Sequence, residues 1–266
     1  MKNDILSALP PDYPWKDRIV YLPSTCSTND DLKKLARQGA PQGTALIAGH
    51  QTGGRGRLGR VFHSPQGKGL YLSLLLRPNC APGDLMHLTC AAGLAARDAV
   101  RAVCDLEPQL KWTNDLVVGR KKLGGILTEL GLGPGGSLEY VIIGIGINCL
   151  HIREDFPPEL RDMAVSLAML TDDPPSVPRL AASLLTQLEK LSKVLLTGKD
   201  GILARYRNCC ITVGQEISLL RADGLTRYGR AVDIDGNGAL IVRFRDGTTE
   251  AVSSGEVSVR GLYGYV

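Results

Sequence analysis

A segment rich in glycine and arginine, QTGGRGRLGR at residues 51–60, is the part of this sequence best suited to carry chemistry. Its glycines let the backbone approach a ligand closely, and Arg55, Arg57 and Arg60 can each bind carboxylate or phosphate oxygens through two parallel hydrogen bonds. Two anions about 4 Å apart repel by roughly 4 kcal/mol at an effective dielectric near 20. Cations between them remove that cost, so the loop suits a carboxylate that attacks a phosphate. The alternative is a basic surface loop, or one that touches RNA.

The glycines of this loop also satisfy G-x-G-x-x-G, the pattern of dinucleotide-binding turns. That pattern requires a helix directly after the glycines, because the helix N-terminus holds the pyrophosphate. Here VFHSPQGKG follows at 61–69, and its proline and glycines break a helix. The sequence therefore excludes a Rossmann-type site.

A second polar segment, KWTNDLVVGRKKLGG at 111–125, combines a strand pattern with amide, acidic and basic groups. Lys122 enters a strand beside two glycines, where it is well placed to hold an anion. The alternative for Lys122 is an exposed hairpin lysine, the commoner state of this residue type. Asn114 and Asp115 are either site residues or turn formers.

Two shorter motifs each have a structural and a functional interpretation. Ser27, Thr28 and Asn29 begin an expected helix, so they can cap it or present polar groups to a ligand head. The segment GIGIN at 144–148 places glycines in an otherwise apolar strand, which indicates tight packing or the close approach of a backbone or ligand.

The elements that must position these groups follow from apolar patterning. Helices are expected from Thr28 to Gly39, over 86–104, and over 177–196 with Ser176 as the cap. Strands are expected over 18–22, 43–51, 70–76, 110–118, 125–130 and 140–147. The last strand is almost entirely apolar, so we expect it at the centre of the sheet.

The pattern changes after Asn208, where short β-rich runs alternate with glycine and aspartate. We expect a small β-barrel of about five strands there, with hairpin turns at 236–238 and 246–247. The expected organisation is an irregular lead-in over 1–20, a catalytic domain over 21–210 and a barrel over 211–266.

Composition places the chain among ordinary soluble proteins, with 44% hydrophobic and 22% charged residues and a net charge of +4. No apolar run is long enough to span a membrane, and no signal peptide is evident, so a cytoplasmic location is expected. The 7 cysteines and 4 histidines lack metal-ligand spacing. The lead-in is too short for a helix-turn-helix reader, so DNA binding is not expected.

Together these motifs resemble the biotin protein ligases, also called biotin–[acetyl-CoA-carboxylase] ligases. The resemblance covers roughly residues 21–262, and its motifs occur in the family's order and approximate spacing. They are STN at 27–29, Q-x-x-GRGR-x-GR at 51–60, SP-x-G at 64–67, KW-x-ND at 111–115, KLGGIL-x-E at 122–129 and GIGIN at 144–148. Thr113 stands where proline is common in the family, and Leu58 where arginine is common.

The resemblance implies an α/β (α+β) fold: a mixed-sheet catalytic domain similar to class II aminoacyl-tRNA synthetases and lipoate ligases, followed by an SH3-like β-barrel. It implies that ATP and biotin are substrates, with Mg²⁺, and that biotinyl-5′-AMP passes its acyl group to a lysine of a biotin carboxyl carrier protein of acetyl-CoA carboxylase or a related carboxylase. It leaves a homodimer open. The alternatives are a lipoate–protein ligase and a non-enzymatic biotin-sensing or RNA-binding protein.

The resemblance also assigns roles to single residues. Catalysis falls to Arg57 and Lys122. The implied biotin-binding residues are Ser27, Thr28, Asn29, Gln51, Arg55, Gly56, Arg57 and Lys122. The implied nucleotide-binding residues are Arg55, Arg57, Arg60, Asn114, Asp115 and Asn148, with magnesium near Asp115. The 51–60 loop is expected to be mobile without ligand and to close over the adenylate.

Overall fold

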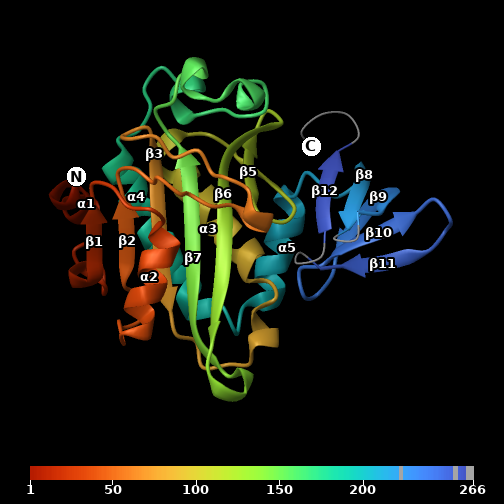
Figure 1. Ribbon diagram of the computed structural model, residues 1–266, viewed down its shortest axis with the longest axis horizontal. Coiled ribbons are helices and arrows are strands. Elements are labelled where there is room, and N and C mark those ends of the chain that lie inside the picture. The colour runs from red at the N-terminus through yellow and green to blue at the C-terminus, as the bar shows by residue number, and fades with distance from the viewer. Residues whose placement is uncertain (222–223, 254–256, 262–266) are drawn as a thin grey trace.

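Seven strands form one mixed sheet in the order β1-β2-β3-β7-β6-β5-β4 (Figure 1). The computed structural model describes residues 1–221, 224–253 and 257–261. The strands are β1 (Ile19–Leu22), β2 (Ala45–Ala48), β3 (Gly69–Leu76), β4 (Gln109–Lys111), β5 (Asp115–Val118), β6 (Lys121–Leu132) and β7 (Leu138–Asn148). Only β1 and β2 pair in parallel among these neighbours. The apolar strand β7 lies at the centre, as its composition predicted.

Helices cover both faces of this sheet. They are α1 (Lys2–Ala8), α2 (Thr28–Arg37), α3 (Leu88–Cys104), α4 (Val177–Val194) and α5 (Lys199–Cys209). Figure 1 shows α2 in front of the sheet and α3 and α4 behind it. Strand residues alternate between the faces: Leu46, Leu75 and Ile142 pack with Leu32 of α2, whereas their neighbours join the larger core of α3 and α4.

The helix caps formed where the sequence predicted them. The hydroxyl of Ser27 accepts from the amide of Asp30 at the start of α2, and that of Ser176 accepts from the amide of Arg179 at the start of α4. After α2, Gly39 adopts φ +88°, which only glycine adopts readily. The cap at Ser27 therefore fixes the position of Thr28 and Asn29, the first two residues of α2.

Two expectations about these elements were wrong, and one helix was not predicted. Residues 110–118 form an antiparallel hairpin of β4 and β5 rather than one strand, and the turn at 112–114 includes a cis peptide bond between Trp112 and Thr113. Helix α5 was not predicted. Residues 1–20 are not irregular, because they contain α1, which buries Ile5 in the main core.

The C-terminal β-domain is a five-stranded antiparallel sheet in the order β11-β10-β9-β8-β12. Its strands are β8 (Glu216–Arg221), β9 (Thr226–Ile234), β10 (Leu240–Phe244), β11 (Thr249–Val252) and β12 (Val257–Gly261). Both expected hairpin turns join consecutive strands, 236–238 between β9 and β10 and 246–247 between β10 and β11. The expected barrel over 211–266 includes residues 222–223, 254–256 and 262–266, which lie outside the described residues.

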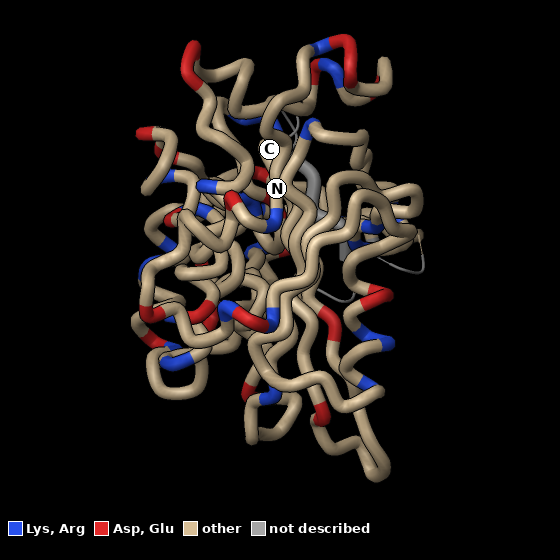
Figure 2. The backbone as a smooth tube through the Cα atoms, turned by 90° about the vertical axis from the view of Figure 1, so that its left-hand side faces the viewer, with Lys and Arg blue, Asp and Glu red and all other residues tan. Residues whose placement is uncertain are grey.

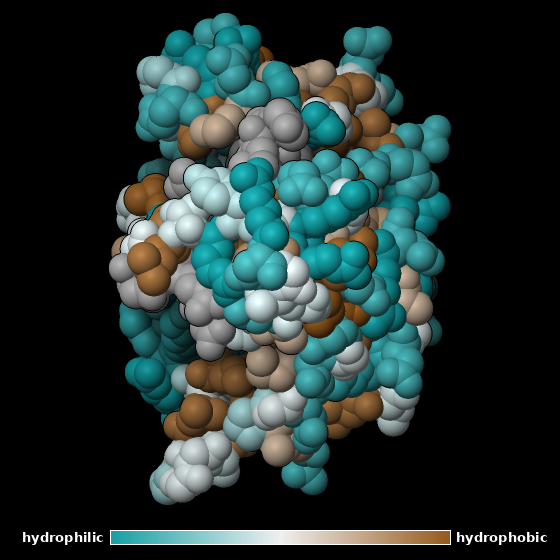
Figure 3. All heavy atoms as spheres, turned by 90° about the vertical axis from the view of Figure 1, so that its right-hand side faces the viewer, coloured by the Kyte–Doolittle hydropathy of each residue, from teal (hydrophilic) through white to brown (hydrophobic). Residues whose placement is uncertain are grey.

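Figure 2 shows charged residues of both signs interspersed along the backbone and separated by uncharged stretches. The face that the C-terminal β-domain presents is mostly hydrophilic, with small separate apolar patches (Figure 3). Scattered apolar residues of this kind are normal for a protein surface. Among the described residues, no helix is long and apolar enough to cross a membrane.

Candidate active site

A cavity of about 680 Å³ opens between the N-terminus of α2, the 51–60 loop, the 112–114 turn and strands β6 and β7. Every residue that the sequence singled out lines it: Ser27, Thr28, Asn29, Gln51, Arg55, Gly56, Arg57, Arg60, Asn114, Asp115, Lys122 and Asn148. They are spread between positions 27 and 148 of the sequence, yet the sheet and α2 bring them around one space.

One group of lining residues is polar and uncharged. The side-chain oxygen of Gln51 accepts from both the amide and the hydroxyl of Thr28, at 2.9 and 3.0 Å. Ser73 of β3 donates to the side chains of Thr28 and Asn29, at 2.8 and 2.6 Å, one proton serving one partner at a time. Because these groups are buried and hydrogen-bonded to one another, they hold fixed positions from which to recognise an uncharged polar head.

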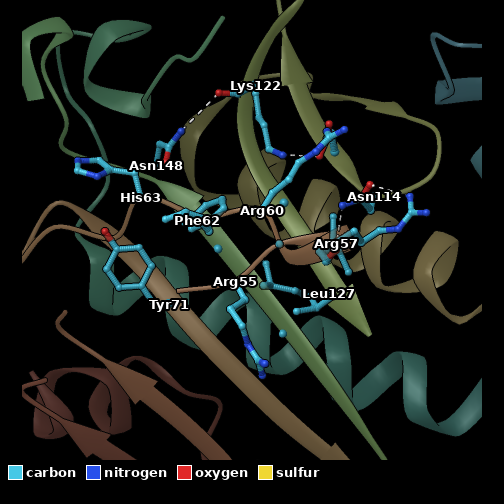
Figure 4. A pocket seen from close by; sticks show the side chains of 18 of the residues that line it. Arg55, Arg57, Arg60, Phe62, His63, Tyr71, Asn114, Lys122, Leu127 and Asn148 are labelled. Atoms are coloured by element: carbon cyan, nitrogen blue, oxygen red, sulfur yellow. Dashed lines mark hydrogen bonds and ion pairs between the residues drawn. The ribbon is translucent and has the colours of Figure 1, made fainter. Parts of the chain in front are cut away.

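The second group is cationic. The ammonium of Lys122 on β6 lies 2.6 Å from a carboxylate oxygen of Asp115. A guanidinium nitrogen of Arg57 lies 3.3 Å from the side-chain oxygen of Asn114, whose own amide donates to the carbonyl of Ile126 at 3.2 Å. Figure 4 shows Arg57 extending toward Asn114 and Lys122 descending from β6 beside them. Cations from two distant segments therefore meet in one cavity.

Arg57 has unused hydrogen-bonding capacity. Within the described part of the chain, its buried Nη2 atom has no hydrogen-bond partner. Burial lowers the pKa of this guanidinium, and the nearby charge of Asp115 opposes that shift. A buried N–H group without a partner is costly, so this atom is suited to an anionic oxygen supplied by a ligand.

Arg55 is oriented differently from Arg57. Its guanidinium forms an ion pair with Asp30 in the first turn of α2, and it is 44% exposed. In Figure 4 its side chain points away from Lys122. Arg55 lines the cavity, but its charge is directed to α2 rather than to the cationic group.

The loop that carries these arginines folds back on itself as a narrow hairpin. The amide of Phe62 donates to the carbonyl of Gly54 at 2.9 Å, and that of Gly56 donates to the carbonyl of Arg60 at 2.7 Å. A Cβ atom at Gly54 would lie 2.6 Å from the hydroxyl oxygen of Ser64, so glycine is required there. No α-helix follows the glycines, in agreement with the exclusion of a Rossmann-type site.

The glycines of the 144–148 motif make room for side chains rather than for another backbone. A Cβ atom at Gly144 would lie 2.2 Å from the side-chain oxygen of Asn29, and one at Gly146 would lie 2.5 Å from the ring of Phe62. Asn148 ends β7 and donates to the carbonyls of Val165 and Lys122 at 3.1 and 3.4 Å. Tight packing is thus the reason for both glycines in this structure.

Several lining residues were not predicted. Phe62, His63, Tyr71, Lys111 and Trp112 form part of the wall, together with Ile126, Leu127 and Ile145. The segment 156–164 contributes Phe156, Leu160, Met163 and Ala164. Lys111 and Trp112 belong to the KW-x-ND motif, which could have identified them. The apolar loop residues have no comparable signal.

The wall at 156–164 is held by an aromatic stack. The rings of His151 and Phe156 lie 4.7 Å apart and nearly parallel, and burial lowers the pKa of His151 to about 4. His63 contacts the carbonyl of Asp155 through a ring nitrogen at 2.9 Å. His151 is therefore a neutral packing group at neutral pH.

Asp115 is the only carboxylate among the described residues that line the cavity. No cluster of three or more metal-ligating side chains occurs among the described residues. Phosphate oxygens and water would therefore supply the other ligands of any magnesium ion here, with Asp115 as the carboxylate ligand.

Comparison with known proteins gives consistent similarities. Residues 21–148 match the model of the biotin/lipoate A/B protein ligase family, and residues 212–260 match the biotin protein ligase C terminal domain. The biotin–[acetyl-CoA-carboxylase] ligase of Mycobacterium tuberculosis is 35% identical over 88% of this chain and 85% of its own length. The bifunctional ligase/repressor BirA of Bacillus spizizenii is 33% identical over 89% of this chain and 72% of its own length.

Solved structures agree with these sequence relatives. The biotin protein ligase of Aquifex aeolicus, determined in complex with biotin and ATP, superposes with a TM-score of 0.76 at 29% identity. The match covers 91% of this chain and 98% of the Aquifex chain, so it includes both sheets.

Proposed function

The chain belongs to the biotin protein ligase family, and from that premise we propose that it activates biotin with ATP to biotinyl-5′-AMP and transfers the biotinyl group to a lysine of a carrier protein. The two half-reactions make it an ATP-dependent, AMP-forming ligase. The family match and the relatives named above support biotin as the acid over lipoate.

One observation carries the proposal: a single cavity holds a neutral hydrogen-bonding group and a separate cationic group. Strand β6 connects them, because Asn29 donates to the carbonyl of Leu127 at 3.3 Å and Lys122 lies five residues earlier on the same strand. Five strand residues span roughly 16 Å. The cavity thus suits an acid with an uncharged polar head, an apolar chain and a carboxylate that must meet a phosphate.

In the first half-reaction a biotin carboxylate oxygen attacks the α-phosphorus of ATP, and the bond to the pyrophosphate oxygen breaks. Arg57 and Lys122 would lie between the two anions, reducing their repulsion and stabilising the charge that develops on the phosphorus oxygens. The chain contributes position and electrostatics here, and no side-chain nucleophile is needed.

In the second half-reaction the neutral ε-amine of the carrier lysine attacks the acyl carbon of the mixed anhydride. The acyl–oxygen bond breaks, AMP leaves, and the amine loses one proton. The wall residues Phe62 and Phe156 would exclude water from the anhydride while the carrier approaches. The nucleotide would lie against Arg60, Asn114, Asp115 and Asn148.

Magnesium would bind as part of the ATP substrate. A carboxylate is a hard oxygen ligand that Mg²⁺ accepts, and Asp115 is the one that the described cavity offers. Asp115 also pairs with Lys122 at 2.6 Å, so a magnesium ion would share this carboxylate with the ammonium group.

We expect transfer of labelled biotin to a biotin carboxyl carrier domain of acetyl-CoA carboxylase when the protein is incubated with ATP and magnesium. The name of the Mycobacterium tuberculosis relative indicates acetyl-CoA carboxylase as the acceptor, and mass spectrometry would locate the label on a lysine. Pyrophosphate exchange with biotin, but not with lipoate, would separate the two ligases. Absence of exchange with either acid would favour a non-enzymatic biotin sensor and contradict the proposal. Light scattering on the same sample would test a homodimer.

The 51–60 loop should become protected from protease when biotin and ATP bind. Without ligand, Arg55 pairs with Asp30 and Arg57 contacts Asn114. Substrate oxygens would replace these partners and hold the loop more tightly. Trypsin cleavage after Arg55, Arg57 or Arg60, followed by mass spectrometry, measures the effect. Equal cleavage rates with and without both substrates would contradict loop closure.

A further inference from the structure

The C-terminal β-domain contacts the back of the 112–114 turn, whose front faces the cavity. The indole nitrogen of Trp112 donates to the carbonyl of Gly238, in the turn between β9 and β10, at 2.9 Å. The backbone amide of Trp112 donates to the hydroxyl of Thr212 at 2.9 Å. Both hydrogen bonds are buried and join residues at least 100 positions apart.

A third contact reaches the same turn from α5. The hydroxyl of Tyr206, a fully buried residue, donates to the carbonyl of Thr113 at 3.2 Å. Nearby, the amide of Ile211 donates to the carbonyl of Leu110 at 2.9 Å. The peptide groups of the turn therefore depend on partners that follow residue 205 in the chain.

The turn that receives Trp112 is itself rigid. A carboxylate oxygen of Asp235 accepts from the amides of Asn237 and Ala239 at 2.8 and 2.9 Å. Gly238 adopts φ +83°, and a Cβ atom there would lie 3.3 Å from the sulfur of Cys90 on α3. The β-domain thus presents a fixed acceptor to the indole.

On the cavity side, the same turn continues into the partners of the two catalytic cations. Asn114 holds Arg57 through its side-chain oxygen, and Asp115 holds Lys122 through its carboxylate. A displacement of the turn would move both cations together. Misplacement of reacting or stabilising groups by about 1 Å can cost up to roughly 100-fold in rate.

We propose that Thr212, Tyr206 and Gly238 are positioning residues for adenylate formation, through which the C-terminal β-domain and the preceding helix α5 fix Arg57 and Lys122 without contacting either substrate. None of the three lines the cavity. The hydrogen bonds of the neutral group come from α2, the segment after β2, β3 and β6, and none of them involves the 112–114 turn. We therefore expect the uncharged head of biotin to be recognised independently of these contacts. The inference rests on the proposed function.

The test compares Thr212→Val, which has nearly the same shape but no hydroxyl, with Thr212→Ser, which keeps the hydroxyl. Tyr206→Phe removes the contact from α5. Val242→Ala, in the buried core of the β-domain, serves as the control for lost stability. For each full-length variant we would measure kcat and the KM for ATP in biotin-dependent pyrophosphate exchange, the Kd for biotin by calorimetry, and Tm.

We expect kcat to fall about tenfold in Thr212→Val and in Tyr206→Phe, while the Kd for biotin stays within about twofold. Thr212→Ser should retain kcat, and Val242→Ala should lower Tm without lowering kcat. Unchanged kcat in both Thr212→Val and Tyr206→Phe, or an equal loss in Val242→Ala, would overturn the inference while leaving the proposed function intact. An unmodified protein without biotin-dependent exchange would instead overturn the proposed function and this inference with it.

Discussion

Replacing Arg57 by alanine should lower the rate of biotinyl-5′-AMP formation by about 100- to 1,000-fold, the cost of losing one preorganised donor to developing negative charge. Arg57 is the guanidinium with a buried nitrogen that lacks a partner in the described part of the chain, so its loss removes a contact reserved for the ligand. Biotin-dependent pyrophosphate exchange measures the effect.

Two variants sharpen this expectation. Arg57→Lys keeps a positive charge but loses the planar fork, so an intermediate loss is expected. Arg101→Ala removes an arginine that is 45% exposed on α3 and pairs with Glu107, and it should leave exchange unchanged. Exchange by Arg57→Ala at a near-normal rate would end the assignment of Arg57.

Replacing Lys122 by alanine should cost a similar factor of about 100 to 1,000. The variant loses the cation and also removes the ammonium that lies 2.6 Å from Asp115, so this carboxylate repels the reacting phosphates more strongly. Adding Asp115→Asn to Lys122→Ala should therefore recover part of the lost activity, even though Asp115→Asn alone is expected to be harmful.

Lys121→Ala is the matched control for Lys122. Consecutive side chains of a strand point to opposite faces, and Lys121 does not line the cavity. It should retain nearly full exchange activity. If Lys121→Ala and Lys122→Ala lost the same exchange activity, the loss would come from a change in the strand and not from the missing ammonium group.

Much of the fold could be predicted from the sequence because its signals are local. The apolar run of β7, the serine caps and the glycine-containing hairpin turns each specify their element through neighbouring residues. The β4–β5 hairpin could not be predicted in this way. Apolar residues flank the 112–114 turn on both sides, so the whole segment has the pattern of a single strand. Helix α5 was missed because its buried face, with Ile202, Leu203 and Tyr206, is defined by the elements packed around it.

The candidate site was predicted through its charged and polar residues, since chemistry restricts which residue types can serve. The apolar walls of the site were not predicted, because aromatic residues in loops, such as Phe62 and Phe156, do not belong to a periodic pattern. The structure also distinguishes the two arginines, because Arg57 contacts Asn114 whereas Arg55 pairs with Asp30. The two interpretations of Gly144 and Gly146 could be separated only by seeing Asn29 and Phe62 occupy the space that side chains there would fill.

The central claim is that Arg57 and Lys122 allow one anion to approach another, and purified biotinyl-5′-AMP bypasses that step. We would measure single-turnover biotin transfer to the carrier domain by the Arg57→Ala/Lys122→Ala variant, once from biotin and ATP and once from saturating biotinyl-5′-AMP. We expect a loss of more than about 1,000-fold from biotin and ATP but less than about tenfold from the preformed adenylate. Equal losses from both starting points would contradict it.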